Sequence, residues 1–216
     1  MLSLFVWILA FIIAITVHEA SHAWMANRLG DPTAKLMGRL SLNPLVHYDP
    51  IGTTLLLVLV IMRAFGAPVI PFGWAKPVEF DAYNLENPRR DAAIISLAGP
   101  LSNIVLSIIL AIVLRFTGPF SVLNYLSPLV YPIIGLNIIL AVFNLIPVHP
   151  LDGGKILVGL LPVKDSQEAD RFLKRYSTII LLFLILPFFG GRSAVSLFLE
   201  PVLDITLGIL IPGFPI

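Results

Sequence analysis

Several stretches of this chain are apolar over lengths that would carry a helix across a lipid bilayer. Residues 2–28, 91–116 and 128–146 reach the roughly 20 residues that a transmembrane helix needs. Backbone polar groups find no partner in lipid, so segments of this kind form helices. Three further apolar stretches are less regular: 51–70, 177–189 and 194–211. We therefore expect an α-helical integral membrane protein with four to six transmembrane or re-entrant helices.

The composition supports a membrane protein. The chain is 57% hydrophobic and 12% charged, whereas a soluble domain is about 45–50% apolar and about 25% charged. The formal net charge of +1 gives no basis for nucleic-acid binding. We therefore expect the protein to lie in a lipid bilayer. The sequence does not predict its oligomeric state.

Polar connections divide the apolar stretches. Residues 30–50 are rich in turn-forming residues, and within them Ala34–Leu42 would form a short strand or hairpin. Residues 162–176 are rich in charged side chains, which indicates a surface helix. A C-terminal helical hairpin is expected after it, over about 177–212. We expect one polytopic domain over 1–216, with a core of about 5–160.

The sharpest chemical signal is the pentapeptide His18-Glu19-Ala20-Ser21-His22, which matches H-E-x-x-H. Residues four apart lie on one face of a helix, so both imidazoles can reach one metal ion. Glu19 lies beside them, where it can hold and deprotonate a water molecule. Zinc suits this chemistry because it lowers the pKa of a bound water to about 7.

A short pattern with three fixed positions also arises by chance. Here the three ionisable groups lie inside a long apolar helix, where each would cost about 2.5–3.5 kcal/mol if charged. A shared metal ion compensates that cost. The setting therefore favours a metal site over a chance match.

A catalytic zinc takes three protein ligands and keeps one position open. The chain has no cysteine, so the third ligand must be His, Asp or Glu. Asp152 is best placed, because it follows an apolar segment and is flanked by helix-breaking Pro150 and by two glycines. The alternative is that Asp152 only caps a helix. The other candidates are His47, Asp49, His149, Glu200 and Asp204.

Two motifs together resemble the site-2 protease family of intramembrane zinc metalloproteases. They are H-E-x-x-H at 18–22 and N-x-x-P-x-x-P-L-D-G-G at 144–154. Residues 98–103 (AGPLSN) are also similar to the family, and residues 72–77 (FGWAKP) to its shorter bacterial members. The resemblance implies an enzyme in a bacterial or archaeal cell membrane that hydrolyses transmembrane protein substrates at or within the bilayer.

The resemblance also implies roles for single residues. His18, His22 and Asp152 would bind one Zn²⁺, and Glu19 would be the general base. Asn144 would hold substrate or stabilise the oxyanion. Asn103 is a second candidate for this neighbourhood, or it forms an interhelical hydrogen bond behind Gly99.

A protease of this kind must unwind its helical substrate. We expect the extended segment to add as a strand to an exposed edge, for which Ala34–Leu42 and Trp74–Phe80 are the candidates. Together they predict a small membrane-associated β element.

A site shared by His18 and Asp152 constrains the topology. Both residues lie towards the C-terminal parts of their helices, so parallel helices bring them to one depth. If 51–70, 91–116 and 128–146 all crossed the bilayer, the first and fourth apolar segments would be antiparallel. We therefore expect 51–70 to be re-entrant or to lie along the surface.

Two other functions use buried His, Asp and Glu residues: a transporter of metal ions or protons, and an inactive protease relative. Transporters tend to show repeated halves, which this sequence lacks, and the intact motif residues argue against an inactive relative. Among the remaining polar residues, His149 could support the ligand Asp152 from outside the ligand set, but it is rather expected to be a loop residue or a regulatory ligand. His47 and Asp49 are expected in a loop, with a cover or regulator of the active-site cavity as the alternative. Glu200 and Asp204 are expected near a helix end, with a gate or a second ion site as the alternative.

Overall fold

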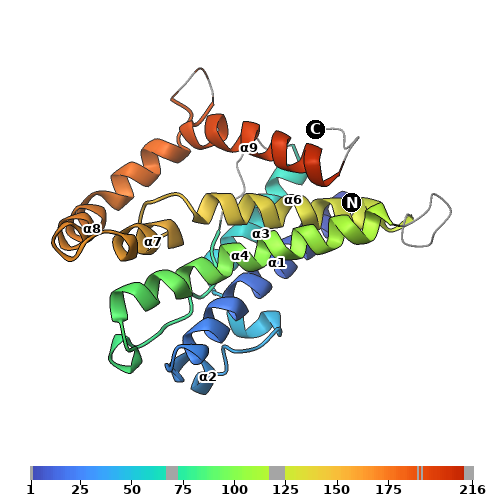
Figure 1. Ribbon diagram of the computed structural model, residues 1–216. Helices are drawn as coiled ribbons and strands as arrows, with labels where there is room; N and C mark the ends of the chain where they lie inside the picture. Colours follow the sequence, from blue (N-terminus) through green and yellow to red (C-terminus); the bar gives the residue numbers. More distant parts are fainter. Residues whose placement is uncertain (1, 67–72, 117–124, 189, 191, 212–216) are drawn as a thin grey trace.

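The computed structural model describes residues 2–66, 73–116, 125–188, 190 and 192–211, and it is built mainly of helices (Figure 1). The long helices are α1 (Leu2–Arg28), α4 (Pro88–Arg115), α6 (Ser127–Asn144), α8 (Val163–Ile185) and α9 (Ala194–Leu210). The short ones are α2 (Thr33–Leu36), α3 (Gly52–Ala64), α7 (Asp152–Leu160) and the 3-10 turns η1 (Pro44–His47) and η2 (Ala82–Asn84).

Helices α1, α4 and α6 form the centre of the fold, and each contacts the other two. The Asn103 amide donates to the Ala14 carbonyl (3.3 Å), whereas His22 meets the Ile95 carbonyl, so α1 and α4 are antiparallel. The Ser107 hydroxyl, in the second half of α4, donates to the Ile134 carbonyl in the first half of α6. Helices α1 and α6 therefore run parallel, as the sequence led us to expect.

Three helices in the described part of the chain are long and apolar enough to cross a bilayer: Leu4–Arg28, Pro88–Arg115 and Ser127–Asn144. The expected number of four to six transmembrane or re-entrant helices is therefore not supported. Helix α3 has 13 residues and extends about 20 Å, less than the roughly 30 Å hydrocarbon core. Its length agrees with the expectation that 51–70 does not simply span, although its place in a membrane stays a prediction.

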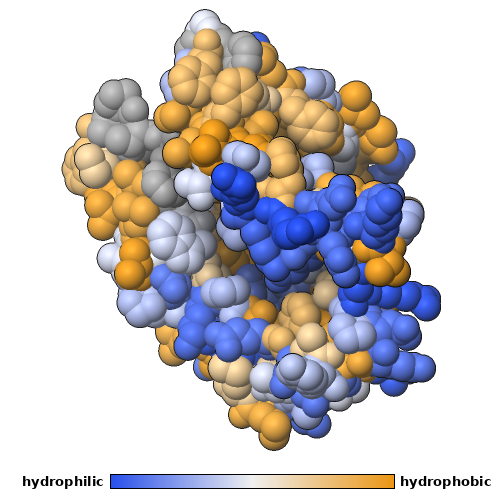
Figure 2. Space-filling model, turned by 90° about the vertical axis from the view of Figure 1, so that its left-hand side faces the viewer, coloured by the Kyte–Doolittle hydropathy of each residue, from blue (hydrophilic) through white to orange (hydrophobic). Residues whose placement is uncertain are grey.

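The C-terminal part differs in its boundaries from the expectation. The charged stretch 162–176 and the apolar stretch after it form one continuous helix, α8, which contacts α9. No glycine or proline interrupts 163–185, so nothing ends the helix where its polarity changes. Hydrophilic side chains gather on the end of the molecule where α4 begins and where α7 and α8 lie (Figure 2).

The predicted β element is wrong for the residues that the structure describes, which contain no β-strand. Within Ala34–Leu42, the chain completes the single turn of α2 and continues in turns and bends. Trp74–Phe80 is irregular, and its amides have other partners: Lys76 N–H donates to the His47 carbonyl (3.0 Å). Side-chain and loop contacts thus satisfy backbone groups that would have been paired between strands in a β-sheet.

Asp31 ties the end of α1 to the loop before α4. Its buried carboxylate accepts four hydrogen bonds, from the Thr33 amide and hydroxyl, the Asp81 amide and the Asn84 side chain, at 2.6–3.0 Å. Burial would raise the pKa of Asp31, but these hydrogen bonds outweigh it and lower that pKa. The carboxylate therefore holds the loop in its charged form.

Asp31→Ala should lower the free energy of unfolding by about 2–4 kcal/mol, because several buried donors lose a charged acceptor. Asp49→Ala is the control: Asp49 accepts from the Ile51 and Gly52 amides at the start of α3, and loss of such a cap costs about 1 kcal/mol. Denaturant unfolding in micelles measures both. Equal losses in the two variants would contradict the central role of Asp31.

The same carboxylate predicts a pH dependence with a defined sign. Its folded pKa lies below the unfolded value of about 3.9. Its stabilisation is therefore complete above the unfolded pKa and is lost as the pH falls through the folded pKa. The stability difference between the parent and Asp31→Asn should shrink in that acid range.

Candidate metal centre

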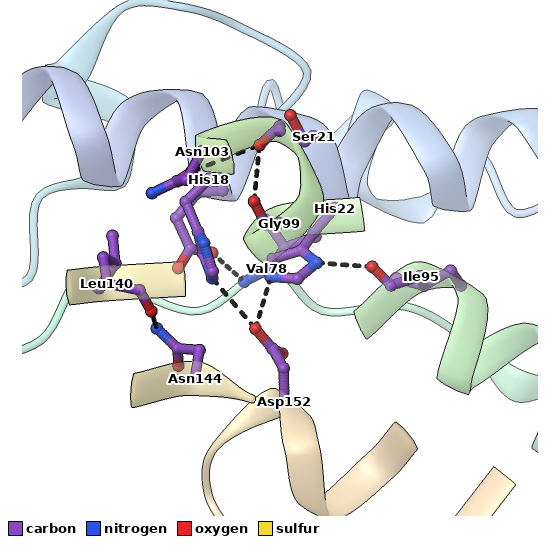
Figure 3. Close-up of polar contacts among 12 residues, drawn as sticks. His18, Ser21, His22, Val78, Ile95, Gly99, Asn103, Leu140, Asn144 and Asp152 are labelled. Carbon is purple, nitrogen blue, oxygen red and sulfur yellow. Dashed lines mark hydrogen bonds and ion pairs between the residues drawn. The ribbon is translucent and has the colours of Figure 1, made fainter. Parts of the chain in front are cut away.

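Two buried histidines on α1 form one side of the candidate site (Figure 3). His18 and His22 are four residues apart, and their rings meet edge to face with centroids 4.6 Å apart. The helix therefore presents both Nε2 atoms to one point, as the motif predicted.

Asp152, the first residue of α7, supplies the third group. Its Oδ2 lies 3.1 Å from His18 Nε2 and 3.2 Å from His22 Nε2. Tetrahedral zinc with bonds of about 2.0–2.1 Å separates its ligand atoms by about 3.3–3.4 Å. Both distances from Asp152 thus match a zinc-binding set to within a few tenths of an ångström, and all three ligand atoms lie within 4.8 Å of one another. Three protein ligands leave a fourth position open.

The orientation of His22 also fits a metal ligand. Its Nδ1 lies 2.7 Å from the Ile95 carbonyl oxygen, to which it donates. In the neutral ring, Nε2 then carries a lone pair that faces an Asp152 oxygen. Two acceptors face each other at this distance only with a cation or a proton between them, and a backbone carbonyl that fixes a histidine tautomer is a usual partner of a metal ligand.

The Asp152 carboxyl is held in its charged form. Burial would raise its pKa, but hydrogen bonds and charge interactions with His18 and His22 outweigh burial and hold that pKa well below its usual range. A charged carboxylate is the form that binds metal.

Gly99 on α4 lets that helix lie against the two imidazoles. A Cβ at this position would lie 2.5 Å from His22 Nε2 and 2.7 Å from His18 Cε1. Gly153 and Gly154 likewise approach backbone: a Cβ on Gly153 would meet the Ile146 carbonyl, and one on Gly154 would lie 2.9 Å from His149 N. Both glycines lie within helix α7, where a side chain at either position would collide with the segment before Asp152.

Glu19 stands beside the three ligand groups and is partly exposed. Its Oε2 accepts a hydrogen bond from the Val78 amide (3.1 Å), which comes from the irregular segment 73–80. Glu19 is not one of the three residues whose ligand atoms cluster. A general base would need a carboxylate that is close to the metal and outside its ligand set.

The two asparagines lie near the site in different ways (Figure 3). The Asn144 amide donates to the Leu140 carbonyl of its own helix (2.9 Å). Asn103 is fully buried, and its bond to the Ala14 carbonyl joins α4 to α1. This is the interhelical bond that was the alternative for Asn103.

The other ligand candidates are not part of the cluster that the structure forms. His47 is buried with its Nε2 2.9 Å from the Ser41 carbonyl, and His149 pairs with Asp170. Glu200 and Asp204 lie inside α9 (Ala194–Leu210) and not near a helix end as expected, because Pro201 does not end the helix. Glu200 forms an ion pair with Arg192, which precedes α9. Asp49 caps α3 and Asp204 is exposed.

Two backbone contributors to the site escaped sequence reasoning, the Ile95 carbonyl and the Val78 amide. Gly99 lay in the family-like tract 98–103, but its contact with the imidazoles was not predicted. Backbone groups carry no residue signature, so the first two leave no trace in the sequence. Gly99 had a signal, because a glycine inside a helical pattern often marks close packing.

The comparisons with known proteins agree with this geometry. The model of peptidase family M50 matches residues 6–127 and 117–187. YwhC of Bacillus subtilis is 37% identical over 85% of this chain and 81% of its own length. MJ0392 of Methanocaldococcus jannaschii is 26% identical over 89% of this chain and 47% of its own length. Rip2 of Mycolicibacterium smegmatis is 31% identical over 83% of this chain and 66% of its own length.

All three relatives are named as zinc metalloproteases, MJ0392 without qualification and YwhC and Rip2 by prediction. No solved structure matches the chain significantly. The family model covers most of the chain, and the relative from Bacillus subtilis is similar over most of both lengths. The chain belongs to peptidase family M50, the site-2 protease family, and is a zinc metallopeptidase.

Proposed function

We propose that this metallopeptidase cuts transmembrane proteins at or within the bilayer, with His18, His22 and Asp152 as its zinc ligands. The observation that carries the proposal is the position of the histidine pair. Both lie buried in α1, inside a segment apolar enough to span a membrane. Ionisable groups at such a depth are expensive and mark function.

Each residue near the centre has a chemical task in this proposal. Zinc, when bound, polarises a peptide carbonyl and makes water acidic enough to ionise near neutral pH. Glu19 accepts the proton of the attacking water and passes it to the leaving amine. The Ile95 carbonyl fixes the ring of His22, and the Val78 amide orients the Glu19 carboxylate.

An apolar cavity of about 710 Å³ lies between α1, α3 and α6 and supports a membrane-embedded substrate. Its wall includes Ile15, one turn before His18 and Glu19, and Leu140, whose carbonyl binds the Asn144 side chain. A cavity of this size accepts several apolar side chains. We propose that it receives the substrate segment next to the cut, with Asn144 at the boundary between this cavity and the metal centre.

To test the proposal, the purified protein is placed in liposomes together with a substrate that has one labelled transmembrane helix, and cleavage of this substrate is measured. The same peptide sequence, shortened so that it stays in water, is offered in parallel. The membrane substrate should be cut, chelation of zinc should abolish cutting, and added zinc should restore it. Gel mobility and mass spectrometry give the extent and place of cleavage.

Two results would contradict the proposal. Faster cleavage of the water-soluble peptide would indicate a site that works outside the bilayer. Zinc uptake into the liposomes without cleavage of either substrate would favour the transporter.

A further inference from the structure

The three ligand groups of the metal centre have unequal support. His18 and His22 belong to a continuous helix of 27 residues. Asp152 begins a helix of nine residues and follows the irregular segment 145–151. Two short-range backbone bonds stiffen that segment, from Val148 N–H to the Ile146 carbonyl (2.8 Å) and from Leu151 N–H to the Val148 carbonyl (2.9 Å). The position of this loop, together with the packing of α7 against α4, therefore sets where the Asp152 carboxylate lies.

His149 is the residue of the loop that reaches another helix. Its Nε2 lies 3.2 Å from Asp170 Oδ1 on α8, and the side chain is 15% exposed. The ring also rests against the first turn of α7, where a Cβ on Gly154 would lie 2.9 Å from His149 Nδ1. His149 is thus held between α7 and α8, three residues before Asp152.

Asp170 is itself fixed from its other side. Lys174, one turn further along α8, places its Nζ 2.6 Å from Asp170 Oδ2. Burial would raise the pKa of Asp170, but the hydrogen bonds from Lys174 and His149 outweigh it and lower that pKa. The carboxylate is therefore a charged acceptor, and α8 gives it a rigid backbone of 23 residues.

We infer that Asp170 and His149 are positioning residues, which hold the 145–151 loop against α8 and so keep Asp152 on the metal centre. This inference rests on the proposed role of Asp152 as a zinc ligand. The pair touches neither substrate nor metal, and its effect passes through the loop backbone. Partners of this outer kind typically change metal affinity or activity by about 10–100-fold.

The experiment measures the rate of zinc release to a chelator, together with kcat and KM, in the full-length protein. His149→Phe and Asp170→Leu remove the hydrogen bond from either side, and the double variant removes both partners. Each single variant should release zinc about 10-fold faster. The double variant should be no faster than the quicker single one, because both break one contact.

Two controls separate positioning from general stability. Asp170→Asn keeps an oxygen that can accept from His149 Nε2–H, so it should restore most of the parent's slow release. Glu200→Gln removes the charge from an exposed ion pair between Glu200 on α9 and Arg192. Neither residue contacts His149 or Asp170, so this variant should release zinc at the parent rate.

Distinct outcomes overturn different claims. If the parent binds zinc and Asp152→Ala does not, yet His149→Phe and Asp170→Leu release zinc at the parent rate, the positioning role is wrong and the ligand set stands. Additive effects in the double variant would show that the two residues do not act as a pair. If Asp152→Ala binds zinc as the parent does, the proposed ligand set fails and the positioning role fails with it.

Discussion

Glu19→Gln should keep its zinc and lose peptide hydrolysis by about 10²–10⁴-fold, the usual contribution of a general base. Glu19 lies outside the His18, His22 and Asp152 cluster, so the change leaves the metal-binding groups intact. The glutamine oxygen can still accept the Val78 amide that binds the carboxylate in the parent. What the amide cannot do is accept a proton from water.

The measurement combines turnover of a transmembrane substrate with zinc content after gel filtration. Glu79→Gln is the matched control, because it removes an exposed carboxylate from the segment that contains Val78. This control should cut at the parent rate. Near-parent turnover in Glu19→Gln would exclude Glu19 as the base, and loss of zinc would make it a ligand.

Gly99→Ala should weaken zinc binding by about 100-fold or more, beyond the usual effect of residues behind the ligands. The new methyl group would lie 2.5 Å from His22 Nε2 and 2.7 Å from His18 Cε1. Real side chains do not approach so closely, so either the imidazoles turn away or α4 moves from α1. Both shifts carry the Nε2 atoms away from Asp152.

Gly135→Ala is the control, because a Cβ at Gly135 on α6 meets no other atom within 4 Å. Alanine is also the better helix former, so this variant should be neutral or slightly more stable. Zinc titration and thermal unfolding distinguish the two sites. If Gly99→Ala bound zinc as tightly as Gly135→Ala, the close approach of α4 would have no bearing on the metal centre.

The parts of the site that could be predicted from the sequence are those with a fixed local geometry. Because His18 and His22 are four positions apart, a helix must bring their imidazoles to one face. The joining of Asp152 to them followed from ligand chemistry and from the broken helix before it. The parallel run of α1 and α6 followed from requiring one depth for both motifs.

What escaped prediction depends on contacts distant in sequence or on competition between local structures. Ile95 orients His22 across 73 positions of the chain through a carbonyl that every residue has. Ala34–Leu42 had turn signals that fit a hairpin, but Asp31 binds the Thr33 amide and favours a helical turn instead. The change of polarity inside α8 looked like a boundary, although helices end at breakers or caps rather than at such changes.

The order of the proposed ligands along the chain has a consequence for biosynthesis. Asp152 follows His18 by 134 positions, which a ribosome adding about 5–20 residues per second needs about 7–27 s to synthesise. During that interval the emerging polypeptide has the histidine pair and the glutamate without the third ligand. With the proposed ligand set, a newly made molecule acquires its metal centre only after α1, α4 and α6 are made, and it would be unable to cut a substrate until then.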